Sequence, residues 1–312
     1  MTRGGPLALA GIAVLVLAPA TFWFWPRAEG PTVNGRITTV PLQSVSNASG
    51  LALVHGPDGL RVATVDEVDE WQGGGDPPPL ITLSDPQTGD AVGGQGHIAE
   101  LGEVEALALR DGVFAYPYKT GAQDVVLRWG TTDIPLVGPQ VIVTLDAAAK
   151  EAGPPPYFYE FEGLEWFGQR WELLAAVVRP DVRETPSSTI AVSRLWFKPD
   201  GTFERLSPLF RLEQSELYRD YAAALCVVGD DIAVVPGFRS EGVSLFDTLG
   251  NRVGYIALPT RRVEGVDYDL ETERLFLVRE CVGDGVECKP GVHFGAPLWI
   301  ANVTRSEMGL SP

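Results

Sequence analysis

A five-residue pattern recurs five times along this chain and constrains its fold more than any other feature. Each copy opens on Ser, Ala or Glu, continues with Gly or Ala, and has Leu or Val third: Ser49–Leu53, Glu105–Leu109, Glu162–Trp166, Ala223–Val227 and Glu264–Tyr268. After each copy come a short polar turn and a second apolar run: Leu60–Val65, Gly112–Tyr118, Trp171–Val178, Asp231–Pro236 and Arg274–Arg279. The repeat therefore predicts five β-hairpins of one design.

Further apolar runs follow the hairpins and predict four strands in each unit. Examples are Ser193–Phe197 with Phe203–Pro208, and Val243–Asp247 with Val253–Leu258, each pair flanking a turn with Gly and Asp or Asn. The last unit has only one such run, Leu298–Val303, whereas a strand-like segment, Gly35–Leu42, stands ahead of the first unit. Because ring closure removes unpaired sheet edges, we expect the N-terminal strand to complete the C-terminal unit.

These strands predict an all-β fold, namely a β-propeller of about five four-stranded blades formed by residues 31–312 as a single domain. The units are unevenly spaced, and the run Gln140–Leu145 belongs to none of the hairpins. Six blades therefore stay open as an alternative. Many Gly and Pro residues, 35 and 25 of them, suit short strands joined by tight turns.

The first 30 residues are interpreted as a targeting element. Arg3 precedes an apolar run from Leu7 to Trp25, long enough for one hydrophobic helix across a bilayer, with Trp near its far end. The stretch Ala18-Pro19-Ala20 also resembles a signal-peptide cleavage site. The segment is thus either a retained signal anchor or a cleaved signal peptide. Both place the remaining chain outside the cytoplasm, in the periplasm or at the cell surface.

Cysteine spacing agrees with an oxidising compartment. Cys281 and Cys288 flank Asp284-Gly285, a pair favoured in two-residue hairpin turns, so a symmetric turn sets the two cysteines opposite each other. We expect a disulfide between them, and two unpaired thiols are the alternative. Cys226 lies in an apolar run and is expected to be a small buried hydrophobic residue.

Charge excludes one class of partner. The chain carries 41 acidic and 24 basic residues, for a net charge of -17. Such a chain repels phosphate backbones and has no basic stripe, so nucleic acid is not expected as a partner.

One face of the predicted ring is the candidate binding face. Three long insertions, Asp66–Pro79, Pro180–Thr189 and Glu280–Pro297, all follow second strands, which places them on the face where the innermost strands begin. The repeat starts there with three carboxylates, Glu105, Glu162 and Glu264. A ring of acidic groups favours a hard cation such as Ca²⁺. The alternative is a purely structural role, in which these glutamates accept backbone N–H bonds and set the blade spacing.

Three further residues belong to this candidate face. His97 and His293 lie in connecting segments and are candidate ligand contacts or bases, although neither has neighbours at metal-ligand spacing. Trp71 offers an aromatic contact surface. No Ser-His-Asp grouping follows from the sequence, so the catalytic residues stay unknown.

The strand starts Glu162-Gly163-Leu164 and Glu264-Gly265-Val266, each followed by a second apolar strand, resemble the SdiA-regulated and phytase-esterase-like propeller families. This resemblance covers about residues 100 to 280 and implies an exported or membrane-anchored propeller, often with a bound cation held by channel carboxylates. Ala106 and Ala223-Ala224 depart from the motif. Phytase chemistry does not follow, because the chain lacks a Lys or Arg cluster for a polyanion.

Two function classes follow from these features, and a third stays open. The first is an anchored recognition module that holds a protein, a glycan or a small ligand on its loop-rich face. The second is a cation-dependent hydrolase or lyase that uses the channel carboxylates, and it requires a carboxylate with a strongly raised pKa. The third is a structural subunit of a membrane complex.

Overall fold

The structure is a computed structural model. It describes residues 36–66, 80–93, 96–97, 104–119, 124–131, 140–144, 160–168, 172–178, 190–198, 202–212, 222–236, 242–258, 263–279 and 295–310. Every regular element in these ranges is a β-strand. The predicted all-β class is therefore confirmed.

The described strands form five four-stranded antiparallel sheets, here called blades 1 to 5. Blade 1 contains β2 (Ala48–Gly56), β3 (Gly59–Asp66), β4 (Leu80–Ser84) and β5 (Gly96–His97). Blade 2 contains β6 (Ala108–Arg110), β7 (Val113–Lys119), β8 (Asp124–Thr131) and β9 (Gln140–Thr144). Blade 3 contains β10 (Glu160–Trp166), β11 (Glu172–Val178), β12 (Ile190–Phe197) and β13 (Phe203–Leu212). Residues 140–144 of the run that belongs to none of the predicted hairpins thus form β9, the outermost strand of blade 2.

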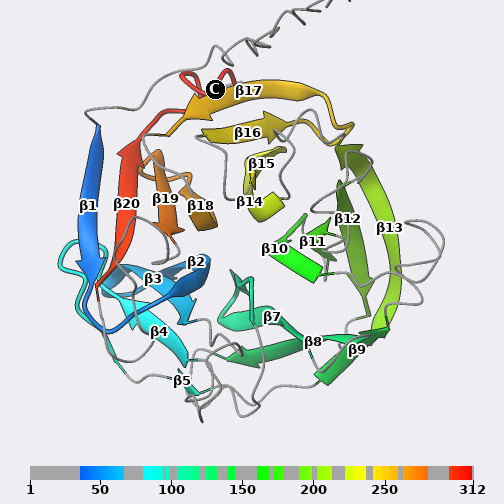
Figure 1. The fold of residues 1–312 in the computed structure, drawn as a ribbon, viewed down its shortest axis with the longest axis horizontal. Helices are drawn as coiled ribbons and strands as arrows, with labels where there is room; N and C mark the ends of the chain where they lie inside the picture. The colour runs from blue at the N-terminus through cyan, green and yellow to red at the C-terminus, as the bar shows by residue number, and fades with distance from the viewer. Residues whose placement is uncertain are drawn as a thin grey trace, which may run out of the picture.

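Blades 4 and 5 complete the ring. Blade 4 contains β14 (Ala222–Val228), β15 (Asp231–Pro236), β16 (Gly242–Phe246) and β17 (Arg252–Ala257). Blade 5 contains β18 (Val263–Asp269), β19 (Arg274–Arg279), β20 (Ala296–Asn302) and, outermost, β1 (Ile37–Leu42). The first strand of each repeat lies innermost, and each inner strand contacts that of the next blade, with β18 returning to β2 (Figure 1). This is the propeller arrangement that the repeat predicts.

The N-terminal strand joins the last blade, as the sequence predicts. β1 pairs antiparallel with β20 from Ile37↔Ala301 to Leu42↔Ala296. An ion pair between Arg36 and Glu307 adds a contact between the two ends of the described chain. Because β1 and β20 come from opposite ends of the sequence, this pairing closes the ring.

The inner strands share a local irregularity at the first position of the repeat. The register shifts at Ala48/Gly50, Phe161/Gly163, Ala222/Ala224 and Val263/Gly265, so that Ser49, Glu162, Ala223 and Glu264 are extra residues in β-bulges. The following small residue then packs against the next inner strand. A β-carbon on Gly163 would lie 2.5 Å from the Leu225 nitrogen, and one on Gly50 would lie 2.9 Å from the Leu107 nitrogen. Small second-position residues thus set the spacing between blades.

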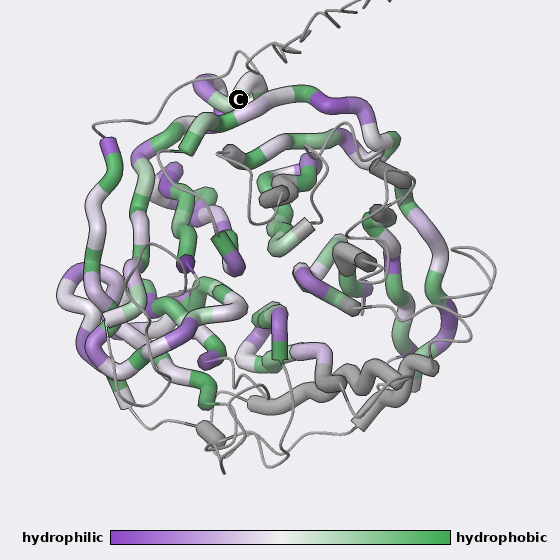
Figure 2. The backbone as a smooth tube through the Cα atoms, in the orientation of Figure 1, coloured by the Kyte–Doolittle hydropathy of each residue, from purple (hydrophilic) through white to green (hydrophobic). Residues whose placement is uncertain are grey.

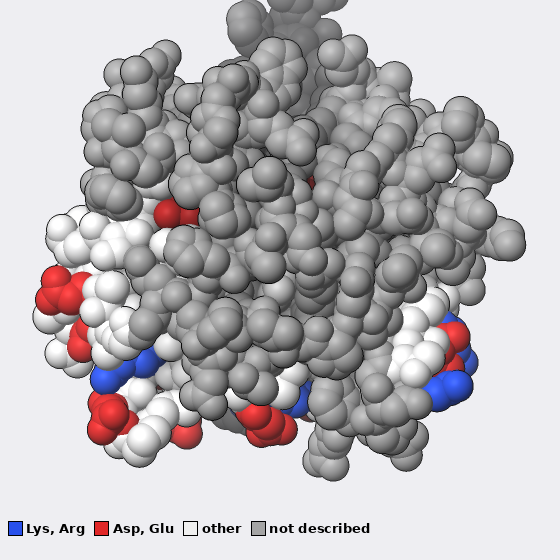
Figure 3. Space-filling view, turned by 90° about the horizontal axis from the view of Figure 1, so that it is seen from below, with Lys and Arg blue, Asp and Glu red and all other residues white. Residues whose placement is uncertain are grey.

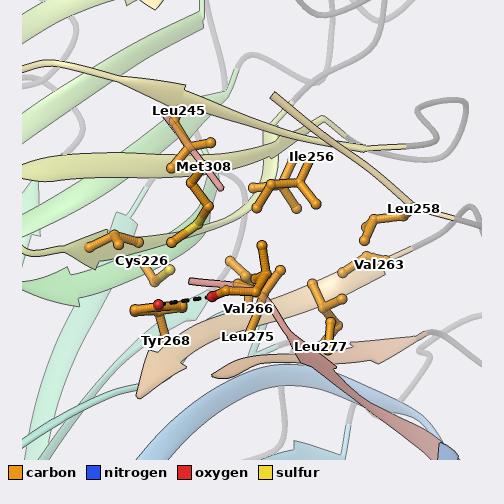
Figure 4. Packing of buried hydrophobic residues seen from close by; sticks show 14 of the residues in the cluster. Cys226, Leu245, Ile256, Leu258, Val263, Val266, Tyr268, Leu275, Leu277 and Met308 are labelled. Carbon is orange, nitrogen blue, oxygen red and sulfur yellow. Dashed lines mark hydrogen bonds between the residues drawn. The ribbon is translucent and has the colours of Figure 1, made fainter. Parts of the chain in front are cut away.

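Apolar layers fill the space between blades, and Figure 2 shows apolar residues distributed along the strands of all five. The layer between blades 4 and 5 includes Cys226, Leu245, Val266 and Met308 (Figure 4). The Tyr268 hydroxyl, inside this layer, donates to the Val303 carbonyl at 3.0 Å. Cys226 is fully buried and unpaired, as its apolar surroundings predict.

Several predictions lie outside the described residues: the N-terminal hydrophobic segment, the Cys281–Cys288 disulfide, Trp71 and His293. In the described ranges, no helix is long and apolar enough to cross a membrane. Figure 3 shows both acidic and basic side chains among the described residues on one edge of the ring.

Candidate functional site

The predicted carboxylates occupy one level of the ring. Glu162 and Glu264 are bulge residues on β10 and β18 and are 4% and 8% exposed, whereas Glu105, just before β6, is half-buried. The described residues contain no group of three or more His, Cys, Asp or Glu side chains placed to hold a metal ion. A calcium site at Glu105, Glu162 and Glu264 therefore stays a prediction.

His97 lies away from this level of the ring. It is in β5, the outermost strand of blade 1, where it pairs with Leu80 of β4. The fold thus separates the His97 backbone from the inner strands by two intervening strands.

Exposure along the inner strands reveals a different accessible region. The first three positions of the repeat are buried on every inner strand except at Glu105. Beyond them, partial exposure begins at the fourth or fifth position of every strand: Leu53, Leu109, Glu165, Val227 and Asp267. We call these five residues the axial site. On β2 and β6 this exposure continues to the short turn. On β10, β14 and β18 buried residues come before the exposed turn: Trp166, Val228, Tyr268 and Asp269.

Hairpin geometry determines what the backbone presents there. The turns after β2, β6 and β14 have two residues each, between the pairs Gly56↔Gly59, Arg110↔Val113 and Val228↔Asp231. A two-residue hairpin closes on a hydrogen-bonded pair, and bonded and non-bonded pairs then alternate along an antiparallel ladder. The fifth repeat residues of β6 and β14, Leu109 and Val227, come directly before the closing pairs and are therefore in non-bonded pairs. The fifth repeat residue of β2, Leu53, is three residues before the closing residue Gly56, and the alternation places it in a non-bonded pair as well. Its N–H and C=O point away from the second strand, toward the ring axis.

Blades 3 and 5 reach the same arrangement through longer turns. In blade 3 the Phe167 N–H donates to the Glu172 carbonyl at 2.8 Å, which makes the preceding residue, Trp166, non-bonded to β11. In blade 5 the Tyr268 N–H donates to a side chain instead of to β19. The five inner strands thus direct fifth-position N–H groups toward the axis: Leu53, Leu109, Trp166, Val227 and Tyr268.

Two carboxylates accept three of these donors. Asp267 Oδ2 accepts from the Leu53 N–H and Oδ1 from the Tyr268 N–H, each at 2.7 Å, so one side chain bridges blades 5 and 1. Glu165 Oε1 accepts from the Trp166 N–H at 2.6 Å. Both acids occupy the fourth repeat position, where the other blades have Ala52, Ala108 and Cys226.

Burial and mutual repulsion change the acidity of this pair. Burial raises the pKa of Glu165 well above its usual range, and the Asp267 charge raises it further. Burial likewise raises the pKa of Asp267 to about 6, against the effect of its two N–H donors. Blade 4 separates the blades that carry these residues, so the two side chains interact across the axis. Burial therefore favours the protonated form of both carboxyl groups, and the Asp267 charge favours it further on Glu165.

Other charged groups surround the pair on its short-turn side. Arg110 lies over the Trp166 ring at 5.3 Å, and its charge favours the ionised form of Glu165. The His55 Nε2 atom lies 3.5 Å from Asp269 Oδ1, and half of the His55 side chain is exposed. Asp269 itself accepts from the Glu271 N–H at 3.1 Å, which shapes the turn between β18 and β19. The short-turn side of this pair thus carries both basic and acidic side chains.

Sequence reasoning missed Glu165 and Asp267 as site residues. The signal was present, because the aligned repeats place Ala, Ala, Glu, Cys and Asp at the fourth position. A carboxylate at a position that is otherwise small and apolar, on an innermost strand, indicates a buried polar site.

Comparisons with known proteins show only distant likenesses. No protein-family model matches the chain, and no curated protein sequence matches it. Among solved structures, the glutaminyl cyclase of Myxococcus xanthus has a TM-score of 0.49 at 11% identity, over 85% of this chain and 95% of that one. A gluconolactonase from Xanthomonas campestris has a TM-score of 0.43 at 16% identity, over 86% and 90%. A luciferin-regenerating enzyme has a TM-score of 0.44 at 11% identity, over 85% and 95%. At these similarities, no activity or residue role transfers to this chain.

Proposed function

We propose that this protein is a recognition module that binds a small polar ligand at the axial site. The observation that carries the proposal is the coincidence of solvent access, two carboxylates and a set of inward N–H groups at one level of the ring. Small-ligand sites combine a few placed polar groups with a rigid scaffold. The inner strands of a closed propeller supply such a scaffold.

The chemistry of the axial site suits a neutral ligand with both donors and acceptors. Asp267 offers a charged acceptor, and Glu165, with its raised pKa, offers a carboxyl donor. Main-chain N–H groups add fixed donors that need no reorganisation on binding. Hydrogen bonds to a charged group are about twice as strong as those between neutral groups, so Asp267 is the main anchor.

Location outside the cytoplasm is part of the same proposal. The apolar run Leu7–Trp25 supports a membrane anchor ahead of the domain, with a cleaved signal peptide as the alternative. A protein or glycan partner on the loop-rich face, which includes Trp71, stays compatible with a small ligand at the other end.

A ligand screen tests the axial site. The full-length chain in detergent micelles, labelled with ¹⁵N, is titrated with small polar compounds while its amide resonances are followed. We expect the ligands that bind to shift the amide resonances of Leu53, Val227 and Asp267. The double variant Glu165→Gln, Asp267→Asn should bind these ligands at least tenfold more weakly. Glu204→Gln, on an exposed part of β13, is the matched control. Ligands that shift only residues elsewhere would refute the axial site.

A second candidate function is hydrolysis or elimination that uses Glu165 as general acid and Asp267 as general base. The observation that favours it is a pair of carboxyl groups at one level of the ring, both with a raised pKa, as acid–base catalysis near neutral pH requires. With any substrate found by the screen, kcat/KM should follow a bell-shaped pH profile with its lower limb near pH 6. A ligand that is bound and released unchanged at every pH would leave recognition as the function.

A further inference from the structure

The axis-facing N–H groups fall into two classes. Those of Leu53, Trp166 and Tyr268 donate to Glu165 or Asp267. In blades 2 and 4 the fourth position holds Ala108 and Cys226, which have no carboxylate to offer. Among the described residues, no side-chain acceptor is bonded to the N–H of Leu109 or Val227. The ring therefore has two donors that its own carboxylates do not occupy.

The two residues that carry these donors are partly exposed. Leu109 and Val227 are half-buried although they lie on innermost strands, whereas the residues just before them, Ala108 and Cys226, are fully buried. We expect solvent to reach their N–H groups, because these groups point toward the ring axis. A polar group that loses water without gaining a bond costs about 1–3 kcal/mol, so any occupant must supply acceptors.

The charges of the site determine what kind of acceptor fits. Asp267 is ionised above about pH 6, and the chain carries a net charge of -17, so an anion is repelled. A neutral carbonyl oxygen avoids this repulsion. Asp267 in turn prefers a ligand that donates. An amide group, which has a carbonyl oxygen and an N–H, meets both demands, whereas an ester or a carboxylate meets only one or neither.

We propose that the axial site binds a small molecule with neutral amide groups, whose carbonyl oxygens accept from the N–H of Leu109 and Val227 while an amide N–H donates to Asp267. This inference deepens the proposed function and rests on it. It specifies the ligand class and the donors, which the proposed function leaves open.

Hydrogen exchange tests the two donors without any ligand. In the full-length chain in micelles, we expect the Leu109 and Val227 amides to exchange about tenfold faster than those of Leu53, Trp166 and Tyr268, which are bonded to carboxylates. Equal protection of all five amides would overturn the inference, because it would mean that the two donors are already occupied.

Titration with three probes tests the ligand class. N-methylacetamide should shift the amide resonances of Leu109 and Val227 in a saturable way, while methyl acetate and acetate should shift them much less. Ala108→Asp places in blade 2 the carboxylate that blade 5 has at Asp267, and this side chain should occupy the Leu109 N–H. The variant should therefore lose the Leu109 shift and keep that of Val227. Because the wild-type titration involves no substitution, the test stands even if Ala108→Asp fails to fold.

The outcomes separate this inference from the proposed function. Acetate or methyl acetate binding as well as the amide would overturn the amide class but leave the axial site. Shifts at Glu165 and Asp267 without any at Leu109 or Val227 would overturn the role of the two donors. The absence of saturable shifts with N-methylacetamide would overturn this inference, and the wider ligand screen would then decide the proposed function independently.

Discussion

The two ends of the inner strands use similar residues for opposite purposes. At the end where the strands begin, a carboxylate on each of three blades sits at the first repeat position, and two of the three are almost fully buried. At the short-turn end, Glu165 and Asp267 lie only three residues further along, yet both are partly exposed. The same strand thus changes from packing element to polar surface within about 10 Å.

This difference indicates which end of the inner strands stabilises a propeller built from such repeats and which end is available for binding. The buried end is held by close backbone approaches, as at Gly163 against Leu225. The accessible end is held by hydrogen bonds that water can replace. Substitutions at the two ends should therefore lower the free energy of unfolding by different amounts, even where they remove the same number of contacts.

Gly163→Ala should produce the largest effect. Its β-carbon would lie 2.5 Å from the Leu225 nitrogen and 2.8 Å from the Ala224 carbonyl carbon, so blades 3 and 4 would have to separate. We expect a loss of about 3 kcal/mol or more in the free energy of unfolding, measured by urea denaturation. Ala106→Gly, at the same repeat position in blade 2, is the control and should cost about 1 kcal/mol. Equal effects of the two changes would show that these positions do not set the blade spacing.

Asp66→Ala tests the buried end through hydrogen bonds. Asp66 Oδ1 accepts from the N–H groups of Ser46 and Asn47 at 2.9 and 2.8 Å, and both donor residues are buried. Removing the carboxylate breaks both of these buried hydrogen bonds, so we expect a loss of about 2 kcal/mol in chemical denaturation. A loss below about 0.5 kcal/mol would mean that water reaches this end as well.

Sequence patterns predicted the scaffold better than the site. The repeat that starts at Ser49 indicated each hairpin, because apolar alternation and turn residues act locally. Closure by β1 also followed, since one strand was missing from the last unit and one was left over at the N-terminus. Glu165 and Asp267 are not among the predicted site residues, because their importance depends on three blades meeting at the axis. The sequence also did not predict which end of the inner strands is more exposed, because exposure depends on how all five inner strands pack together.

Glu165→Gln should change how stability depends on pH. Burial raises the pKa values of Glu165 and Asp267, so the folded state holds protons that the unfolded chain has already lost. Their contribution is present at low pH and is lost as the pH rises, for Asp267 through about pH 6. Glutamine removes one of these protons and the carboxylate that the Asp267 charge repels. We expect a flatter profile of melting temperature between pH 5 and pH 8, on the order of several degrees higher at pH 8.

A matched control isolates this effect. Glu204→Gln removes a carboxylate from an exposed position on β13 and should leave the wild-type profile unchanged. Parallel profiles for wild type and Glu165→Gln would contradict a coupled pair at the axis.

Asp267→Ala should have the smallest effect on stability, although it removes as many main-chain hydrogen bonds as Asp66→Ala. Of its two donors, the N–H of Leu53 belongs to a partly exposed residue, where water can take the place of the carboxylate, whereas both donors of Asp66 belong to buried residues. The substitution also removes a carboxylate that burial disfavours, since the pKa of Asp267 is raised to about 6. At pH 8, where that carboxylate is ionised, the two terms oppose each other, and urea denaturation should show a change within about 1 kcal/mol. A loss as large as that of Asp66→Ala would mean that the axial site is closed to water, and the contrast between the two ends of the inner strands would then be wrong.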